Sequence, residues 1–299
     1  MKPMKTVAAC VVTYNRRELL LECIDHLLAQ TVAAIMDVII VDNASTDGTQ
    51  EALADHIAKG NIIYVNTGSN LGGAGGFQRC FREATQRGYE YAWVMDDDCM
   101  PEANALEELL VYGDALGGDF GYLSSKVLWK DGSICVMNVQ RQKLFKNVED
   151  YSPRAIPIDL ASFVSLFVPT SVVREVGLPI KEFFLWTDDW EYTRRISLKH
   201  PCYLVPSSVV VHKSAMNIGA NIAYESSERL DRFEMMYRND VYLYRREGVR
   251  GFLYECARLT AHAARVITRS SDHRGDRLRS IARGTMKGFG FRPEIEYVD

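Results

Sequence analysis

Short apolar runs alternate with stretches of helical periodicity through the first part of the chain. The apolar runs are typical of strands buried on both faces, and they occupy residues 6–13, 37–42, 62–66 and 91–95. Residues 17–30, 49–59 and 78–87 instead repeat their apolar side chains with the period of a helix. Strands that alternate with helices predict right-handed crossovers and a parallel sheet, so we expect an α/β fold.

The later part of the chain continues the sheet and then becomes helical. Further strands are predicted at residues 120–129, 160–168 and 203–212, with a short helix at 172–176. The polar stretch 130–157 is expected to form a hairpin or a loop over the site. Beyond it, aromatic, methionine and arginine residues recur in helical segments. We therefore predict one domain at residues 1–224 and a basic, aromatic-rich helical region at 225–299.

Composition adds a charge asymmetry to this picture. Of the 299 residues, 47% are hydrophobic and 25% charged, which is ordinary for a globular protein and argues against general disorder. The net charge is −4, but residues 229–292 hold 15 Lys and Arg against 7 Asp and Glu, a net +8, which leaves −12 for the rest. This basic region either packs against the first domain or rests on anionic lipid headgroups. It carries no zinc-finger, helix-turn-helix or RNA-binding signature, so no nucleic-acid partner is expected.

The cysteines and the lengths of the apolar runs indicate the cellular compartment. The seven cysteines are scattered without a CxxC pair or a zinc spacing, which favours small core residues in a reducing environment. Residues 1–5 lead directly into the first strand, so no signal peptide is expected. No apolar run reaches the roughly 18 residues that span a bilayer. We expect a cytoplasmic protein, with any membrane contact peripheral and on the inner face of the cytoplasmic membrane.

Three adjacent carboxylates, Asp96, Asp97 and Asp98, directly follow a predicted strand. In open α/β sheets ligands bind at the carboxyl ends of the strands, where these acids would lie. Adjacent carboxylates repel one another, and a hard divalent cation that bridges them to the phosphates of a ligand removes this repulsion. The alternative is an exposed acidic turn that caps the following helix.

Two further segments carry candidate binding residues. Residues 70–77 contain four glycines before a predicted helix, a composition that suits either an anion-binding turn with free N–H groups or a merely structural tight turn. Residues 186–192 interleave acids with aromatic side chains. Thr187 is the predicted N-cap of the next helix, whose dipole favours acids in the first turn. Capping does not explain Trp190 or Tyr192, so we interpret these aromatic residues as a platform for a sugar ring.

The order of these motifs resembles that of the family 2 glycosyltransferases, inverting enzymes with the GT-A fold that use nucleotide-sugar donors. The matching stretches are residues 12–16, 41–48, 70–76, 95–98 and 186–192, followed by His212. The Gly-Gly-Ala-Gly-Gly and Trp-x-Asp-Asp-x-Glu-Tyr sequences are most similar to galactofuranosyltransferases and rhamnosyltransferases of bacterial envelope polysaccharides. The resemblance implies a Rossmann-like, mostly parallel central sheet flanked by helices, with a C-terminal helical extension. Thr187 departs from the pattern, because the nearest relatives run Trp directly into Asp-Asp.

The resemblance also implies which residues bind the donor and a metal. Donor binding is expected of Thr13, Tyr14, Asn15, Arg16, Asp42, Asn70, Gly72, Gly73, Asp96 and Asp97. Within this group Thr13 and Asp42 would hold the base, with Asp42 accepting from the uracil or thymine N–H. Asp96, Asp98 and His212 would bind a divalent metal, Mn²⁺ or Mg²⁺, beside the diphosphate. Such a metal offsets the charge of the leaving nucleotide, so no general acid is required.

The acceptor side is implied by the Asp-Asp pair. Asp189 matches the position of the catalytic base, which takes a proton from the acceptor hydroxyl during attack on the anomeric carbon. Asp188 would raise the pKa of Asp189 by like-charge repulsion. Acceptor binding is expected of Trp186, Asp188, Trp190 and Glu191.

Together these features predict a metal-dependent inverting glycosyltransferase. It would move a sugar, most simply galactofuranose from UDP-galactofuranose, onto a growing cell-envelope glycan such as an O-antigen, free or lipid-linked. A rhamnosyltransferase that uses dTDP-rhamnose is the alternative of the same class. A catalytically silent nucleotide-sugar or glycan-binding subunit, and a nucleotidyltransferase, are alternatives of other classes. The sequence is also compatible with an oligomer.

Overall fold

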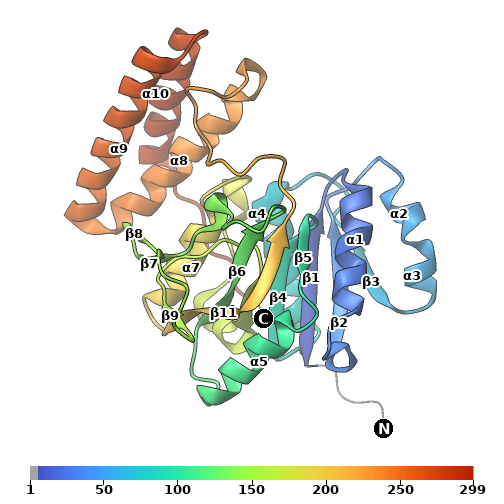
Figure 1. Ribbon diagram of the computed structural model, residues 1–299. Coiled ribbons are helices and arrows are strands. Elements are labelled where there is room, and N and C mark those ends of the chain that lie inside the picture. Colours follow the sequence, from blue (N-terminus) through green and yellow to red (C-terminus); the bar gives the residue numbers. More distant parts are fainter. Residues whose placement is uncertain (1–5, 299) are drawn as a thin grey trace.

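A computed structural model describes residues 6–298, and its centre is one mixed β-sheet (Figure 1). The strands are β1 (Val7–Thr13), β2 (Met36–Asp42), β3 (Ile62–Asn66), β4 (Tyr91–Asp96), β5 (Cys99–Pro101), β6 (Tyr122–Trp129), β9 (Ile156–Pro157), β10 (Leu166–Pro169) and β11 (Cys202–His212). Their order is β3-β2-β1-β4-β10-β6-β11-β5, and β9 pairs with β11. Strands β3, β2, β1 and β4 are parallel to one another. β10 is antiparallel to its neighbours β4 and β6, and β11 is parallel to β6. The predicted α/β fold is confirmed.

Helices cover both faces of the sheet because successive side chains of a strand point to opposite faces. The helices are α1 (Arg17–Leu28), α2 (Thr49–Ala52), α3 (Ala54–Ala58), α4 (Gly72–Gln86), α5 (Ala105–Ala115), α6 (Thr170–Val176) and α7 (Asp188–Ser197). Val11 packs in a core cluster with side chains of α1 and α5, and its neighbour Val12 packs in another with side chains of α4, α6 and α7. The cysteines of the described residues are all unpaired, six of them buried and Cys256 exposed, so their predicted use as small core residues is confirmed for six.

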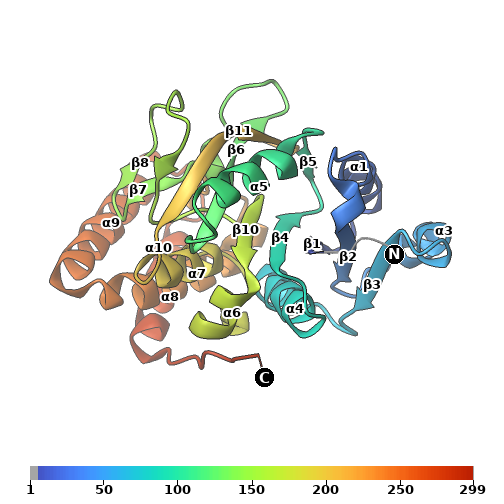
Figure 2. The same ribbon diagram turned by 90° about the horizontal axis from the view of Figure 1, so that it is seen from below.

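The C-terminal helices pack together at one side of the sheet (Figure 1). They are α8 (Leu230–Arg246), α9 (Gly248–Arg269) and α10 (Arg274–Gly290), and Phe233, Val266 and Ile281 belong to their common core. After α10 the chain returns to the helices that cover the sheet and passes near α6 (Figure 2). There the Leu178 N–H donates to the Glu296 carbonyl at 2.8 Å. No helix of the described residues is long and apolar enough to cross a membrane.

Several predicted elements differ in their bounds. The stretch predicted as a strand at 160–168 is a strand only over Leu166–Pro169, because Ser165 has a positive φ of 57° that interrupts extended backbone. The helix predicted at 49–59 is broken at Leu53 into α2 and α3. The polar stretch 130–157 does contain a hairpin, of β7 (Arg141–Lys143) and β8 (Lys146–Asn147).

The glycine-rich segment lies inside α4 rather than before it. A Cβ on Gly76 would lie 2.5 Å from Val12 Cγ1, so the glycine lets α4 approach β1 closely. Gly72 has a φ of 71°, and its Cβ would lie 2.2 Å from the Phe184 carbonyl oxygen. Gly72 and Gly76 are therefore required for packing, and the binding of an anion by this segment stays a prediction.

Replacement of Gly72 by Ala is expected to destabilise the protein by about 3 kcal/mol, because it combines overpacking against backbone with a left-handed residue. Gly73→Ala is the matched control, since its Cβ would meet no atom within 4 Å. Urea unfolding of both variants measures the difference. Equal stabilities would show that the loop at Phe184 gives way at no cost.

Candidate active site

The carboxyl ends of four strands meet at one edge of the sheet and carry polar side chains. β1 ends at Thr13 and β2 at Asp42, which are direct partners in register. β4 ends at Asp96, beside Val12 of β1. β11 ends at His212 and runs parallel to β6, which shares the direction of β4 because both are antiparallel to β10. The topology thus brings a histidine from late in the chain to the acids of β4.

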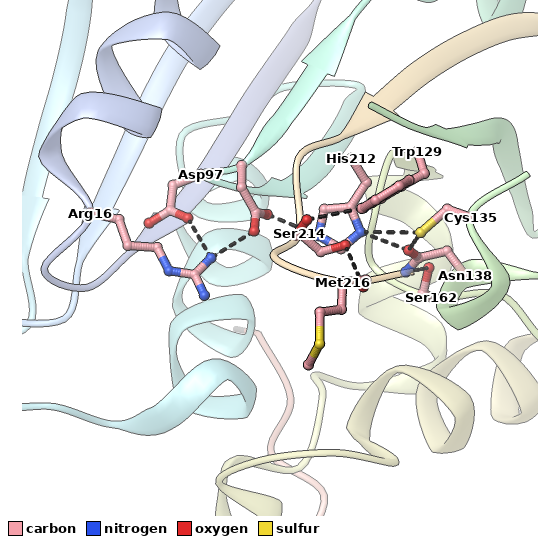
Figure 3. Close-up of polar contacts among 10 residues, drawn as sticks. Arg16, Asp97, Trp129, Cys135, Asn138, Ser162, His212, Ser214 and Met216 are labelled. Atoms are coloured by element: carbon pink, nitrogen blue, oxygen red, sulfur yellow. Dashed lines mark hydrogen bonds and ion pairs between the residues drawn. The ribbon is translucent and has the colours of Figure 1, made fainter. Parts of the chain in front are cut away.

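Asp97 and Asp98 are buried and held by the first loop of the chain (Figure 3). The Thr13 hydroxyl donates to Asp97 at 2.8 Å. Arg16 Nη1 lies 3.3 Å from Asp97 and 2.7 Å from Asp98, so one guanidinium, about half exposed, contacts both carboxylates. The repulsion expected between adjacent acids is thereby partly neutralised by Arg16.

His212 lies against Asp98, with its Nε2 atom 3.0 Å from Asp98 Oδ1. That oxygen is buried and has no partner with hydrogen-bond geometry. A buried carboxylate oxygen and a ring nitrogen that face each other are a suitable donor pair for a divalent cation. The Cys99 thiol lies within the same group, and burial and the charge of Asp98 raise its pKa well above the usual value, which disfavours the thiolate. The chain therefore offers Asp98 and His212 as ligands that fit a metal.

The other ring nitrogen of His212 is held by a hydrogen-bonded chain (Figure 3). His212 Nδ1 lies 2.8 Å from Asn138 Oδ1, and Asn138 Nδ2 donates to Ser162 Oγ at 3.0 Å. Because the amide oxygen of Asn138 can only accept, Nδ1 carries a proton, and Nε2, which faces Asp98, would be the nitrogen that binds a metal. Asn138 thus orients the imidazole, a role that the sequence analysis did not assign.

Burial and mutual repulsion change the pKa values of these acids. Burial raises the pKa of Asp96 to about 7, and the charge of Asp98 acts in the same direction. Burial also raises the pKa of Asp97 to about 6 against the opposing charge of Arg16. For Asp98 the effect of burial is outweighed by contact with His212 and Arg16, which lowers its pKa. Burial alone would lower the pKa of His212, but Asp98 raises it to about 10.

The remaining residues predicted to hold the nucleotide surround the loops after β1 and β2. Asn15 has a positive φ of 53° and accepts from the Thr46 N–H at 2.7 Å, joining the two loops. Tyr14 is exposed. Asp42 is fully buried, and its two oxygens accept from the Ser45 N–H and the Tyr64 hydroxyl. Its predicted contact with a base stays a prediction, and that contact would have to share an oxygen with one of these donors.

The glycine-rich turn is partly occupied by protein partners. The Gly72 N–H donates to Asn70 Oδ1 at 2.8 Å, and the Ala74 N–H donates to the Phe184 carbonyl at 3.2 Å. Gly73 lines the central cavity. Gly73 therefore lies at the cavity, as donor binding would require. Asn70 instead stabilises the turn through its hydrogen bond with Gly72.

A cavity of about 510 Å³ lies between the sheet edge, α7 and the C-terminal helices. Asp96 and His212 line it from the sheet, and Asp188 and Asp189 line it from the first turn of α7. Burial raises the pKa of Asp189 well above the usual value, reinforced by the charges of Asp188 and Asp96. Burial also raises the pKa of Asp188 to about 6. The arrangement places a carboxylate with a raised pKa in the same cavity as His212, a candidate metal ligand.

The predicted acceptor residues are placed differently from one another. Trp186 and Trp190 both line the cavity. One face of Trp190 is covered by the Arg141 guanidinium, 3.8 Å from the ring centre, and the side chain also packs against the cluster that includes Leu160 and Leu243. Glu191 does not line this cavity and instead binds Arg195 at 2.7 Å. Glu191 is therefore not among the residues that the fold brings to the site.

Several cavity residues were missed by the sequence analysis. Arg141 comes from the β7–β8 hairpin, and Asp240, Arg258 and His262 come from α8 and α9. The basic stripe of α9 was interpreted as a surface for packing or for lipid, but Arg258 points inward and pairs with Asp240 at 2.6 Å. The division at residue 224 stays a prediction, and both sides of it contribute to one cavity.

Comparison with known proteins bears on the family and the fold of this chain. Residues 8–119, a little over a third of the chain, match the family model described as "Glycosyl transferase family 2". The resemblance inferred from the motifs is confirmed, and the match supports a glycosyltransferase enzyme.

Similar curated proteins are glycosyltransferases. Galactofuranosyltransferase GlfT1 of Mycolicibacterium smegmatis is 34% identical over 36% of this chain and 34% of its own length. GlfT1 of Mycobacterium tuberculosis is 37% identical over 31% of each chain. Glycosyltransferase GlyG of Streptococcus pneumoniae is 31% identical over 34% of this chain and 33% of its own. The chain thus matches about a third of the length of these relatives.

Solved structures support the fold over a longer span. The crystal structure of S. aureus TarS 1-349 in complex with UDP-GlcNAc covers 95% of this chain and 73% of the TarS chain, with 14% identity and a TM-score of 0.55. The structure of GalNAc-T7 with UDP, GalNAc and Mn²⁺ covers 82% of this chain and 48% of the other, with 12% identity and a TM-score of 0.62. At this identity the likeness concerns the fold, and the predicted GT-A fold is confirmed.

Proposed function

We propose that the protein is an inverting glycosyltransferase that transfers a sugar from a nucleoside diphosphate to a hydroxyl of a glycan acceptor. The observation that carries the proposal is that Asp189 of α7 and the Asp96–His212 edge of the sheet line one cavity. A base and candidate metal-binding residues that line the same cavity suit displacement at an anomeric carbon, in which an acceptor oxygen attacks while the bond to the diphosphate breaks.

The chain's own residues supply the proton transfer. Asp189 takes the proton of the acceptor hydroxyl as its oxygen attacks the anomeric carbon, and the bond to the diphosphate breaks on the opposite face, which inverts the configuration. The burial that raises the pKa of Asp189 makes it a stronger base than an exposed carboxylate. A divalent cation, Mn²⁺ or Mg²⁺, held by Asp98 and His212 would offset the charge of the leaving diphosphate.

The donor sugar is proposed to be galactofuranose, delivered as UDP-galactofuranose. The similarity to the two GlfT1 proteins supports this choice over rhamnose from dTDP-rhamnose. The test is to incubate the protein with Mn²⁺, an acceptor disaccharide and, in parallel, UDP-galactofuranose, dTDP-rhamnose or UDP-galactose. Release of nucleoside diphosphate with one donor supports transfer and names the sugar. Pyrophosphate release would indicate a nucleotidyltransferase, and binding without turnover a silent subunit.

A peripheral contact with an anionic membrane is proposed for the outward face of α9. Phe252, Leu253 and Ile267 are exposed there, and the helix has exposed arginines, while its one acid, Glu255, is buried. An apolar face flanked by cations suits a surface of anionic headgroups and acyl chains.

Leu253→Glu is expected to reduce pelleting with vesicles that contain phosphatidylglycerol, because the new carboxylate opposes both burial and the anionic surface. Val111→Glu, at an exposed position of α5, is the matched control and should leave pelleting unchanged. Co-sedimentation with and without phosphatidylglycerol measures the effect. Equal pelleting of wild type and Leu253→Glu would rule out this face.

A further inference from the structure

The loop that leads into α7 has an unusual backbone. Phe184, Trp186 and Thr187 have φ values of 63°, 65° and 67°, in the left-handed region that side chains disfavour. All three side chains are bulky, and Thr187 is β-branched. Such a conformation persists only where surrounding contacts impose it, and it is common where a functional group must be held in place.

The contacts that impose it come from α8. Asn239 is fully buried, and its Nδ2 atom donates to the carbonyls of Phe183 and Leu185 at 3.1 Å and of Trp186 at 2.9 Å. Its neighbour Arg238 donates to the carbonyl of Glu182 at 2.6 Å. The backbone of the loop is therefore bound by adjacent side chains of one helix.

The end of the loop is bound by the next residue of α8. Asp240 Oδ1 accepts from the Thr187 hydroxyl at 2.7 Å, and Asp240 Oδ2 pairs with Arg258 of α9 at 2.6 Å. Thr187 is the residue before the first turn of α7, but its hydroxyl caps no helical N–H. The predicted role of Thr187 as an N-cap is thus wrong for its side chain, because Asp240 takes its hydroxyl instead.

We infer that Arg238, Asn239 and Asp240 form a clamp that positions Asp189 for proton transfer. The clamp fixes the loop directly before α7, and Asp189 is the second residue of that helix. These are positioning residues, since they act through the loop and through Thr187. The inference rests on the proposed function of Asp189. It means that α8 and α9 not only line the cavity but also help to position the catalytic base.

A matched pair of variants tests the clamp. Thr187→Val keeps the shape and β-branching of the side chain but removes the hydroxyl that Asp240 binds, whereas Thr187→Ser keeps the hydroxyl. Thr187→Val is expected to lower kcat by about 10- to 100-fold, since a small displacement of a catalytic group has effects of this order. Its KM for the donor should stay close to wild type, whereas its Tm should fall because the buried Asp240 Oδ1 loses a hydrogen-bond donor. Thr187→Ser should restore most of kcat. Wild-type kcat in Thr187→Val, or equal losses in the two variants, would overturn the inference.

Hydrogen exchange separates the clamp from the proposed function. Exchange of the amides of residues 184–190 is expected to be faster in Thr187→Val than in wild type or Thr187→Ser, with or without donor. If wild type transferred no sugar from any donor, the proposed function would fail, and this measurement alone would decide the clamp. Unchanged exchange in Thr187→Val would overturn it.

Discussion

Asp189→Asn is expected to lower kcat by about 10²- to 10⁴-fold, because the amide cannot accept the proton of the acceptor hydroxyl. The substitution preserves size, and the amide oxygen can still accept from the Trp190 N–H, as the carboxylate does at 2.7 Å. Donor binding, measured by calorimetry with the nucleotide-sugar, should therefore stay nearly unchanged. Wild-type turnover in this variant would show that another group is the base.

The same assignment predicts the pH dependence of the wild-type enzyme. Burial and the charge of Asp188 raise the pKa of Asp189, so the base is protonated and inactive at pH values where an exposed carboxyl would be ionised. kcat should therefore rise with pH through a midpoint well above the usual carboxyl pKa. Asp188→Asn removes one cause of the shift and should move the midpoint to lower pH. Because the two acids interact, the midpoint belongs to the pair.

Asp98→Ala and His212→Ala are each expected to weaken Mn²⁺ binding by about 100-fold or more, since the loss even of groups that only support metal ligands costs 10- to 100-fold. Metal-dependent binding of the donor should weaken in parallel. Titration calorimetry or the electron paramagnetic resonance of Mn²⁺ measures the affinity.

Asp55→Ala is the control for these two variants, because Asp55 is an exposed acid of α3. It should bind Mn²⁺ as wild type does. Unchanged affinity in both Asp98→Ala and His212→Ala would place the metal elsewhere or remove it from the mechanism. Thermal unfolding of each variant excludes simple loss of the fold.

The sheet and its polar edge were predictable because they depend on local patterns. The apolar runs that became β1, β2 and β4 end in Thr13, Asp42 and Asp96, and parallel strands bring such ends together. The role of the glycine-rich segment was harder to predict, since glycine serves both anion-binding turns and the close packing of helices. The close approach of Gly76 to Val12 is an example of close packing.

The C-terminal region shows where sequence reasoning ended. An arginine on an amphipathic helix has the same pattern whether it faces lipid or a buried acid, and only the packing of α8 and α9 assigns Arg258 to Asp240. The local pattern also predicted that the Thr187 side chain caps α7. Its hydroxyl instead donates to Asp240 of α8, a helix far along the chain that the local pattern does not record.

By itself, the sequence determined the order of the elements, the chemistry at the strand ends and the family that they resemble, since these follow from the period of side chains and from motifs in order. Only the tertiary structure decided which side chains share the cavity, that Asn138 orients His212 and that Asn239 binds the loop before Asp189. The physical reason is that such hydrogen bonds join residues distant in the chain, and neither partner's local pattern records the other.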